Sequence, residues 1–224
     1  MLELVEEPLD SRVLQYLNTS PENDGGQWDM AVNLLEKYGL CPQTLYPETW
    51  HSSNSGKVDS LITSKLREYT LELRALYASR VSSLSSQESL SHKSRAEIAN
   101  LAIQACRSRK SEQMSEVYTI LAMTCGVPPK ADDKLTYEFY DKKGKFQSIK
   151  ASPKEIYRSL EASHFKASDN ISLINDPRNE VSKLYTVQRL GNVWGARPVL
   201  YVNTEVDVLE QTVVKMLKAD VPVW

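Results

Sequence analysis

A cysteine thiol and a histidine imidazole can act together as nucleophile and base, and Cys41 and His51 lie close enough in the sequence to suggest that chemistry. Cys41, however, precedes Pro42 in a loop at the exit of a predicted helix. We therefore interpret Cys41 as a buried or half-buried thiol and His51 as a surface loop histidine. Catalysis by this pair is the alternative, and it predicts a thiol-dependent activity that is lost on Cys41→Ala.

The other residues of catalytic type form no constellation. Two further cysteines fall on apolar helical faces, where a free thiol behaves as a small hydrophobic group. Two further histidines have no metal-ligand partners at useful spacing, and no glycine-rich phosphate loop is present. The sequence therefore predicts no metal and no cofactor. A lysine cluster in a turn could contact a polyanion, but such turns are usually only solvated, so nucleic-acid binding stays open. These residues are Cys106, Cys125, His92, His164, Lys142, Lys143 and Lys145.

The composition is that of a globular protein. The chain has 224 residues, 41% of them hydrophobic and 25% charged, and its formal net charge of -2 gives no general argument for nucleic-acid or membrane binding. An odd number of widely spaced cysteines predicts a reducing, intracellular compartment without structural zinc. No signal peptide or membrane-spanning run is evident, so we expect a soluble protein without membrane contact.

The elements around these residues start with the segment NDGGQWDMAVNLLEKYG, residues 23–39. Four apolar residues in this segment recur at helical spacing and predict the buried face of a helix. Gly39 is placed to end that helix. The same pattern assigns Asp29 and Asn33 to the solvent face. Gly25 and Gly26 precede the helix, and paired glycines indicate a plain turn, a left-handed backbone or a close approach to the main chain. The four apolar residues are Ala31, Leu34, Leu35 and Tyr38.

A helical part follows. Apolar spacing predicts a long helix over 57–84, and the serine-rich stretch 79–94 is interpreted as a mobile connection that frays its end. A second helix is expected from Arg95, with Cys106 on its apolar face. A third is expected up to Gly126, with Met114, Val117, Tyr118, Leu121 and Cys125 on one face.

The pattern then changes to a period of two. Residues 135–151 predict a β-hairpin, and SPKE at 152–155 predicts a capping box that begins a helix. Strands are expected at 171–175 and 199–203, and Thr204 is expected to cap a last helix. The final residues, 220–224, are strand-like and end on Trp224. That ending suggests that the chain is part of a longer sequence.

The segment 23–39 resembles papain-like cysteine peptidases, in which an Asn-Gly-Gly segment leads into a short helix that ends in Tyr-Gly. Within that superfamily the bleomycin hydrolase family is the better match, because further segments resemble it in the same order. This resemblance implies an α+β, papain-like fold that is partial here and carries a large helical insertion. The matching segments are 20–48, 64–74, 135–142, 174–178 and 183–187.

The resemblance also implies a role for the paired glycines. In papain-like enzymes such a pair forms one wall of the cleft, where a bound peptide lies against the glycine main chain as a short antiparallel strand. Carried over by position, Gly25 and Gly26 contact substrate, and their neighbours shape the adjoining pocket or hold the turn. Trp28 could equally be a core anchor. These neighbours are Asn23, Asp24, Gln27 and Trp28.

The family's catalytic groups are not matched. Its nucleophilic cysteine lies well upstream of the glycine pair, and the 24 residues before Gly25 contain no cysteine. Its base histidine and orienting asparagine lie downstream of the strand on which this sequence ends. The chain is thus expected to be an internal, inactive part of such an enzyme, with no catalytic residue of its own. The expected divisions are 1–55 (end of the left lobe), 56–130 (helical insertion) and 131–224 (start of the second lobe).

By resemblance, the complete protein is a cytoplasmic cysteine aminopeptidase that hydrolyses N-terminal peptide bonds and the amide of bleomycin-like compounds through an acyl-enzyme. It is a homohexamer assembled largely through the helical insertion. About half of the apolar positions in these helices are expected to cover their own subunit's core instead. The alternative function is a non-catalytic helical oligomerisation or interaction protein derived from that family.

Overall fold

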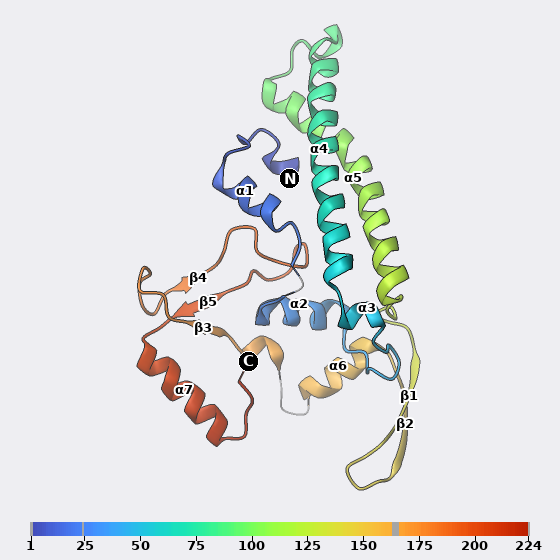
Figure 1. Ribbon diagram of the computed structural model, residues 1–224, viewed down its shortest axis with the longest axis vertical. Coiled ribbons are helices and arrows are strands. Elements are labelled where there is room, and N and C mark those ends of the chain that lie inside the picture. The colour runs from blue at the N-terminus through green and yellow to red at the C-terminus, as the bar shows by residue number, and fades with distance from the viewer. Residues whose placement is uncertain (1, 24, 163–165, 224) are drawn as a thin grey trace. The chain divides into compact units, whose positions relative to one another are not determined.

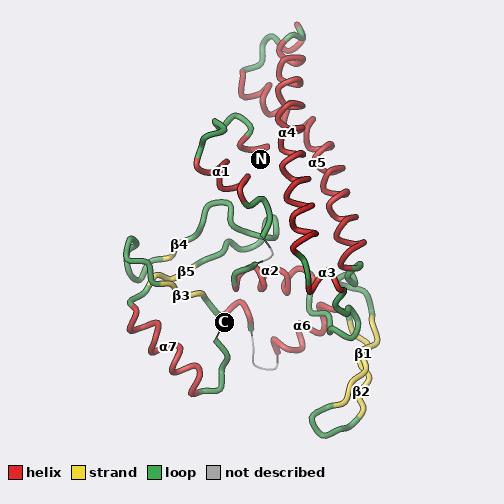
Figure 2. The backbone as a smooth tube through the Cα atoms, viewed as in Figure 1, coloured by secondary structure: helices red, strands yellow, loops and turns green. Residues whose placement is uncertain are grey.

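The computed structural model describes residues 2–23, 25–162 and 166–223. The described chain forms two compact units (Figures 1 and 2). The first contains residues 2–23 and 48–127, and the second contains residues 25–47 and the described part of 128–223. His164, Asp24 and Trp224, which the sequence analysis singled out, lie outside the described residues. Among the described residues, no helix has the length and apolar character needed to cross a membrane.

The first unit is helical and is dominated by a hairpin of two long helices, α4 (Gly56–Ser85) and α5 (Arg95–Cys125) (Figure 1). The remaining elements are short: η1 (Leu2–Leu4), α1 (Arg12–Thr19), α3 (Trp50–Ser53) and η2 (Glu88–Leu90). The predicted helix over 57–84 is confirmed. The first part of the serine-rich stretch, residues 79–85, still belongs to α4. Ser94 caps α5 with a capping box to Glu97.

The two helices predicted after Arg95 are one helix of 31 residues. The polar segment between the two apolar faces contains neither glycine nor proline, so nothing in it breaks the hydrogen-bond ladder. Its middle is tied to α4 instead. The carboxylate of Glu72 accepts hydrogen bonds from Arg109 Nη2 at 2.9 Å and from Gln113 Nε2 at 3.0 Å. Gly126, at φ 83°, ends α5 as predicted.

The core of this unit lies between α4, α5 and the N-terminal segment. Leu2 and Val5 pack with Leu73, Tyr77 and Cys106, all of them buried. Burying five such side chains supplies the main hydrophobic stabilisation of the unit. The hydroxyl of Tyr77 donates a 2.8 Å hydrogen bond to Glu6, so the N-terminal segment is attached by a polar contact as well.

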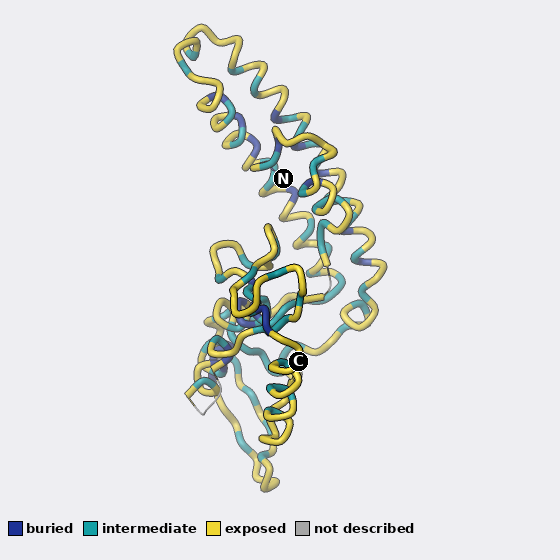
Figure 3. Tube along the Cα trace, turned by 90° about the vertical axis from the view of Figure 1, so that its left-hand side faces the viewer, coloured by how far each residue is buried: buried dark blue, intermediate teal, exposed yellow. Residues whose placement is uncertain are grey.

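Much of the apolar surface of α5 is not used in this core. Met114, Tyr118 and Leu121, expected on one face of a helix, are exposed, and only Val117 and Cys125 of that face are half-buried. Figure 3 shows the exposed residues along both long helices. In this single chain α4 contacts the Gln113 side of α5 instead, through the hydrogen bond from Gln113 to Glu72.

The second unit combines helices with two small sheets. Its helices are α2 (Trp28–Tyr38), α6 (Pro153–Ala162), η3 (Ala167–Asp169) and α7 (Val206–Lys218). One sheet is the hairpin of β1 (Leu135–Tyr140) and β2 (Phe146–Ala151), which confirms the prediction for 135–151. The other has the order β3 (Ser172–Ile174), β5 (Tyr201–Asn203), β4 (Leu184–Tyr185). β5 runs parallel to β3 and antiparallel to β4.

Two predictions near the C-terminus are wrong. Thr204 does not cap α7, because it is buried and its backbone N–H donates to Ile174 as a continuation of β5; the N-cap residue is Glu205. Residues 221–223 form no strand. Asp220 turns into the left-handed region at φ 56°, and the amide of Val221 donates back to Met216. This hydrogen bond ends α7 instead of starting an extended segment.

The start of α6 has the predicted capping box. The N–H of Ser152 donates to Glu155 at 2.8 Å, and the N–H of Glu155 donates to the Ser152 hydroxyl at 3.3 Å. Lys134 also binds the Glu155 carboxylate. The Lys134 contact, followed by the Ser152 amide, lowers the pKa of Glu155 from 4.5 to about 2.

We expect this cap to lose its charge-dependent stabilisation in acid. Because the pKa of Glu155 is depressed in the folded state, the stabilisation is complete above about pH 4.5 and is lost as the pH falls through about 2. Glu155→Gln keeps an acceptor for the Ser152 amide but removes the charge. The difference in urea midpoint between wild type and Glu155→Gln should therefore shrink from pH 7 to pH 2.5. A difference that stays constant over this range would contradict the prediction.

Candidate functional site

The two glycines lie directly before α2, on exposed backbone that contains no turn. Gly26 is not in the left-handed region, and a Cβ placed on it would have no atom within 4 Å. The predicted turn includes Asp24, which lies outside the described residues, so the plain turn stays a prediction. At Gly26 neither backbone strain nor the chain's own packing explains the absence of a side chain. What remains at Gly26 is exposed main chain with open space beside it, to which another extended backbone has access.

The neighbours of this pair differ in their surroundings. Asn23 is exposed and belongs to the first unit, and Asp24 lies outside the described residues. Gln27 is half-buried, with extended backbone at φ -120° and ψ 160°, and precedes α2 without a side-chain capping bond. Trp28 begins α2, and its indole N–H donates to the carbonyl of Ala167 at 3.1 Å. That bond favours the interpretation of Trp28 as an anchor of α2.

The face of α2 that is buried is not the predicted one. Asp29 and Asn33, assigned to solvent, are only 1% and 2% exposed, and Val32 between them is fully buried. Leu34 and Tyr38, assigned to the core, are exposed. The correction has a physical cause: α2 packs against α6 and η3, and its Asp29–Asn33 face meets backbone groups and the Arg197 side chain of the segment 192–200, which pair with an aspartate and an asparagine.

This polar contact is a buried ion pair with supporting hydrogen bonds. Asp29 Oδ1 lies 2.9 Å from Arg197 Nε, and Asp29 Oδ2 accepts the backbone N–H of Leu200 at 2.8 Å. The Asn33 amide donates to the carbonyl of Arg197 at 3.0 Å. The Asn192 amide donates to the carbonyl of Met30 at 2.9 Å. The segment 192–200 is thereby fixed to the first turns of α2.

The described cysteines do not have the surroundings of an activated nucleophile. Cys41 is half-buried, burial raises the pKa of its thiol, and its Sγ contacts the carbonyl of Pro42 at 3.7 Å. His51 belongs to the other unit and is half-buried rather than on the surface, with its ring edge-to-face against Trp50. Cys106 is fully buried, and burial raises the pKa of its thiol too. A raised pKa opposes formation of the thiolate that catalysis needs.

Comparison with known proteins adds the family. The model of the Peptidase C1-like family matches residues 1–224. This chain belongs to the Peptidase C1-like family. It is 33% identical to human bleomycin hydrolase over 222 residues, which are 98% of this chain and 44% of that protein. It is 34% identical to aminopeptidase C of Listeria innocua over an aligned length of 227 residues, which covers 100% of this chain and 45% of that protein.

A solved structure agrees with these matches. The crystal structure of PepW from Lactobacillus rhamnosis HN001 superposes with a TM-score of 0.77 at 34% identity, covering 97% of this chain and 44% of that one. The resemblance to the papain-like bleomycin hydrolases and the mixed α+β fold are thus confirmed. The chain spans less than half the length of the relatives it matches.

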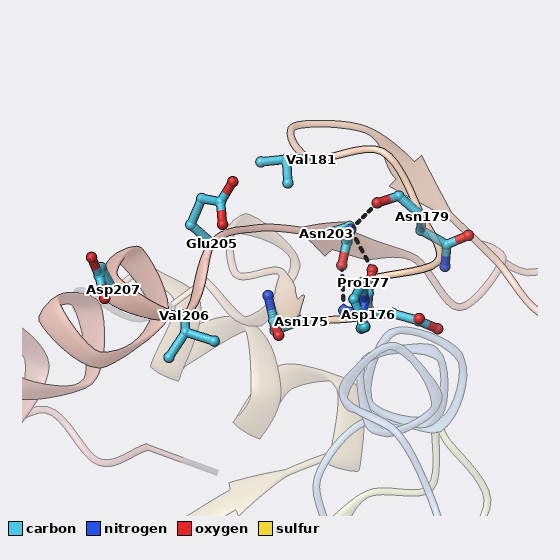
Figure 4. A pocket seen from close by; sticks show the side chains of 9 residues that line it. All are labelled: Asn175, Asp176, Pro177, Asn179, Val181, Asn203, Glu205, Val206 and Asp207. Carbon is cyan, nitrogen blue, oxygen red and sulfur yellow. Dashed lines mark hydrogen bonds between the residues drawn. The ribbon is translucent and has the colours of Figure 1, made fainter.

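The second unit also contains a pocket of about 540 Å³, which lies between the segment 174–178 and the start of α7 (Figure 4). The amide of Asn203 holds its loop: Oδ1 accepts the N–H of Asp176 at 2.7 Å, and Nδ2 donates to Asn179 O at 2.9 Å. Arg178 binds the Asp176 carboxylate through two nitrogens and lowers its pKa to about 2. None of the described residues of 23–28 lines this pocket, and its hydrogen bonds serve to shape the loop.

The lysine cluster lies at the tip of the hairpin, as predicted. Lys142, Lys143 and Lys145 are exposed, and Gly144 between them adopts φ 73°. The Asp141 carboxylate accepts the backbone N–H groups of Lys143 and Lys145, and these bonds lower its pKa. An ionised carboxylate within the tip offsets part of its positive charge. Polyanion binding by these lysines stays an untested prediction. Within the described part of the chain, no group of three metal-ligating side chains is found.

Proposed function

We propose that this chain is part of a cysteine aminopeptidase that removes N-terminal residues from peptides and hydrolyses the amide of bleomycin-like compounds. The reaction would proceed by thiolate attack on the carbonyl carbon, loss of the amine and hydrolysis of the acyl-enzyme. The observation that carries the proposal is the match of 98% of the chain to a relative named bleomycin hydrolase. A second relative, named aminopeptidase C, supports the exopeptidase activity.

Within that enzyme, the proposed role of Gly25 and Gly26 is to bind the substrate backbone. The exposed glycine main chain would pair with an extended peptide, as a strand is added to a sheet edge. The open space around a Cβ at Gly26 supports this role, because the chain itself does not fill that space. Asn23, Asp24, Gln27 and Trp28 would shape the adjoining pocket, with Trp28 acting through its contact with Ala167.

The chain as given is proposed to be inactive. Thiol peptidases need a thiolate with an imidazole beside it, and the two groups act as a unit. The raised pKa values of the Cys41 and Cys106 thiols argue against either as that nucleophile. In the complete enzyme the glycine segment would be the cleft wall. Residues 56–130 would be the helical insertion, and residues 131–224 would begin the second lobe.

We also propose that α4 and α5 carry contacts between subunits of a homohexamer. Large apolar side chains are exposed on both helices, and such residues mark protein interfaces when they are grouped. These residues are Leu61, Leu71, Leu101, Met114, Tyr118, Leu121 and Met123. A cytoplasmic location is proposed on the basis of the family resemblance and of the three free cysteines, which suit a reducing compartment.

The test is the intact mass and the aminopeptidase activity of the protein purified from its natural source. We expect hydrolysis of aminoacyl-amide substrates that iodoacetamide abolishes. The recombinant 224-residue chain should be inactive, and Cys41→Ala should change neither preparation. Thiol-dependent activity of the recombinant chain that Cys41→Ala abolishes would restore Cys41 as the nucleophile. A natural protein of this length that is inactive but forms a stable oligomer would favour the non-catalytic interaction protein.

A further inference from the structure

The loop between β4 and β5 carries a Trp that the proposed function does not use. Trp194 is 88% exposed, although tryptophan usually buries most of its surface. It lies in a turn in which the N–H of Ala196 donates to the carbonyl of Val193 at 3.3 Å. Gly195 follows at φ 77°, the positive value that a type II turn requires at its third residue. The sequence thus places a large apolar side chain at the corner of a defined turn.

That turn is attached to the helix that follows the glycine segment. Asn192, two residues before Trp194, donates to the carbonyl of Met30 at 2.9 Å. Arg197, three residues after Trp194, forms the buried ion pair with Asp29 at 2.9 Å. Two or three residues of extended chain span at most about 7–11 Å, so Trp194 stays near both anchors. Both anchors are in the first turn of α2.

The glycine segment leads into the same turn of α2. Gly26 precedes Trp28, the first residue of α2, by two positions. A peptide of five residues in extended conformation spans about 17 Å. To contact Trp194, a peptide paired with Gly25 and Gly26 must continue past the start of α2, where the two anchors hold the Trp194 turn.

We propose that Trp194 is a specificity-determining residue that contacts an apolar side chain of the peptide bound along Gly25 and Gly26. The inference rests on the proposed function, since it assumes that the glycine segment binds substrate. Its physical basis is that a Trp on a fixed turn offers a large apolar area at little cost in side-chain entropy. Tryptophan is accordingly common among the residues that dominate binding energies.

The experiment measures peptide binding, so that it does not depend on activity. The probes are pentaalanine amide and the five pentapeptides in which one alanine is replaced by leucine. Binding to the ¹⁵N-labelled protein is followed by the NMR signals of the indole N–H groups, with the Trp194 signal assigned from the spectrum of Trp194→Phe. Trp50→Ala is the matched control, because Trp50 is 69% exposed and lies in the other unit.

At least one leucine peptide should bind more tightly than pentaalanine and shift the Trp194 signal. Trp194→Ala should weaken binding of that peptide about tenfold and of pentaalanine less than twofold, and Trp50→Ala should change neither. Gly26→Val should abolish binding of both, because its side chain occupies the space that the peptide backbone needs. A leucine preference that survives Trp194→Ala overturns the inference.

Two further outcomes separate this inference from the function on which it rests. If Gly26→Val leaves peptide binding unchanged, or if no peptide binds the wild-type protein, the glycine wall itself is wrong and the inference falls with it. If Gly26→Val abolishes binding but Trp194→Ala changes only the oligomeric mass in sedimentation, Trp194 is a subunit contact and only the inference is overturned.

Discussion

Replacing Asp29 with alanine is expected to lower the free energy of unfolding by about 3 kcal/mol, the lower end of the range for breaking a buried ion pair. The variant leaves the guanidinium of Arg197 without its carboxylate and the N–H of Leu200 without its acceptor. The lower end of that range applies because the Arg197 side chain is 26% exposed in the folded protein. Its guanidinium can therefore reach water in the variant.

Asp207→Ala is the control for Asp29→Ala. Both aspartates are the second residue of a helix, so the two variants lose the same interaction with the helix dipole, worth about 0.3–1 kcal/mol. Asp207 is exposed, so burial is what separates them. The measurement is urea unfolding at pH 7 for both variants and for the double variant Asp29→Ala, Arg197→Ala, which should be less destabilised than the sum of its parts. Equal midpoints for Asp29→Ala and Asp207→Ala would contradict the prediction.

The Asp29 contact also explains where prediction from the sequence failed. The apolar spacing in α2 is real, but the Asp29–Asn33 face of the helix packs on the loop 192–200, over 150 positions away along the chain. A periodic pattern identifies a helix without identifying its partner. Only an aspartate and an asparagine four residues apart, on one face of the helix, signalled that this face could be polar.

Elements determined by neighbouring residues were predicted correctly. The hairpin over 135–151, the capping box at 152–155 and the helix end at Gly126 each depend on side chains within a few positions. Thr204 looked like such a local cap but is held by β3, which begins 32 positions earlier. The glycine segment was located through family resemblance, and its openness at Gly26 became apparent only from the structure.

The exit of α2 gives the second large expected effect, because Gly39→Ala cannot be accommodated without moving backbone. Gly39 has φ 80° and ψ -165°, a conformation almost restricted to glycine. A Cβ there would lie 2.2 Å from the carbonyl carbon of Pro153 and 2.3 Å from the nitrogen of Lys154. The N–H of Leu40 donates to the carbonyl of Pro153 at 2.9 Å, so the two backbones are held together at this point. We expect Gly39→Ala to cost at least about 3 kcal/mol of unfolding free energy, combining conformational strain with the lost contact.

Gly144→Ala is the comparison at a positive-φ glycine that lacks the close backbone contact. Gly144 has φ 73° but an open position for a Cβ, so its substitution should cost only the conformational term of about 1–2 kcal/mol. Thermal and urea unfolding of both variants provide the measurement, and a Gly39→Ala variant no less stable than Gly144→Ala would refute the steric argument. The consequence for function follows from the position of the two contacts. Asp29 holds the entrance of α2 and Gly39 its exit, so the helix that carries the proposed glycine wall is fixed at both ends. Gly39→Ala should therefore also weaken peptide binding at Gly26, whereas Gly144→Ala should not.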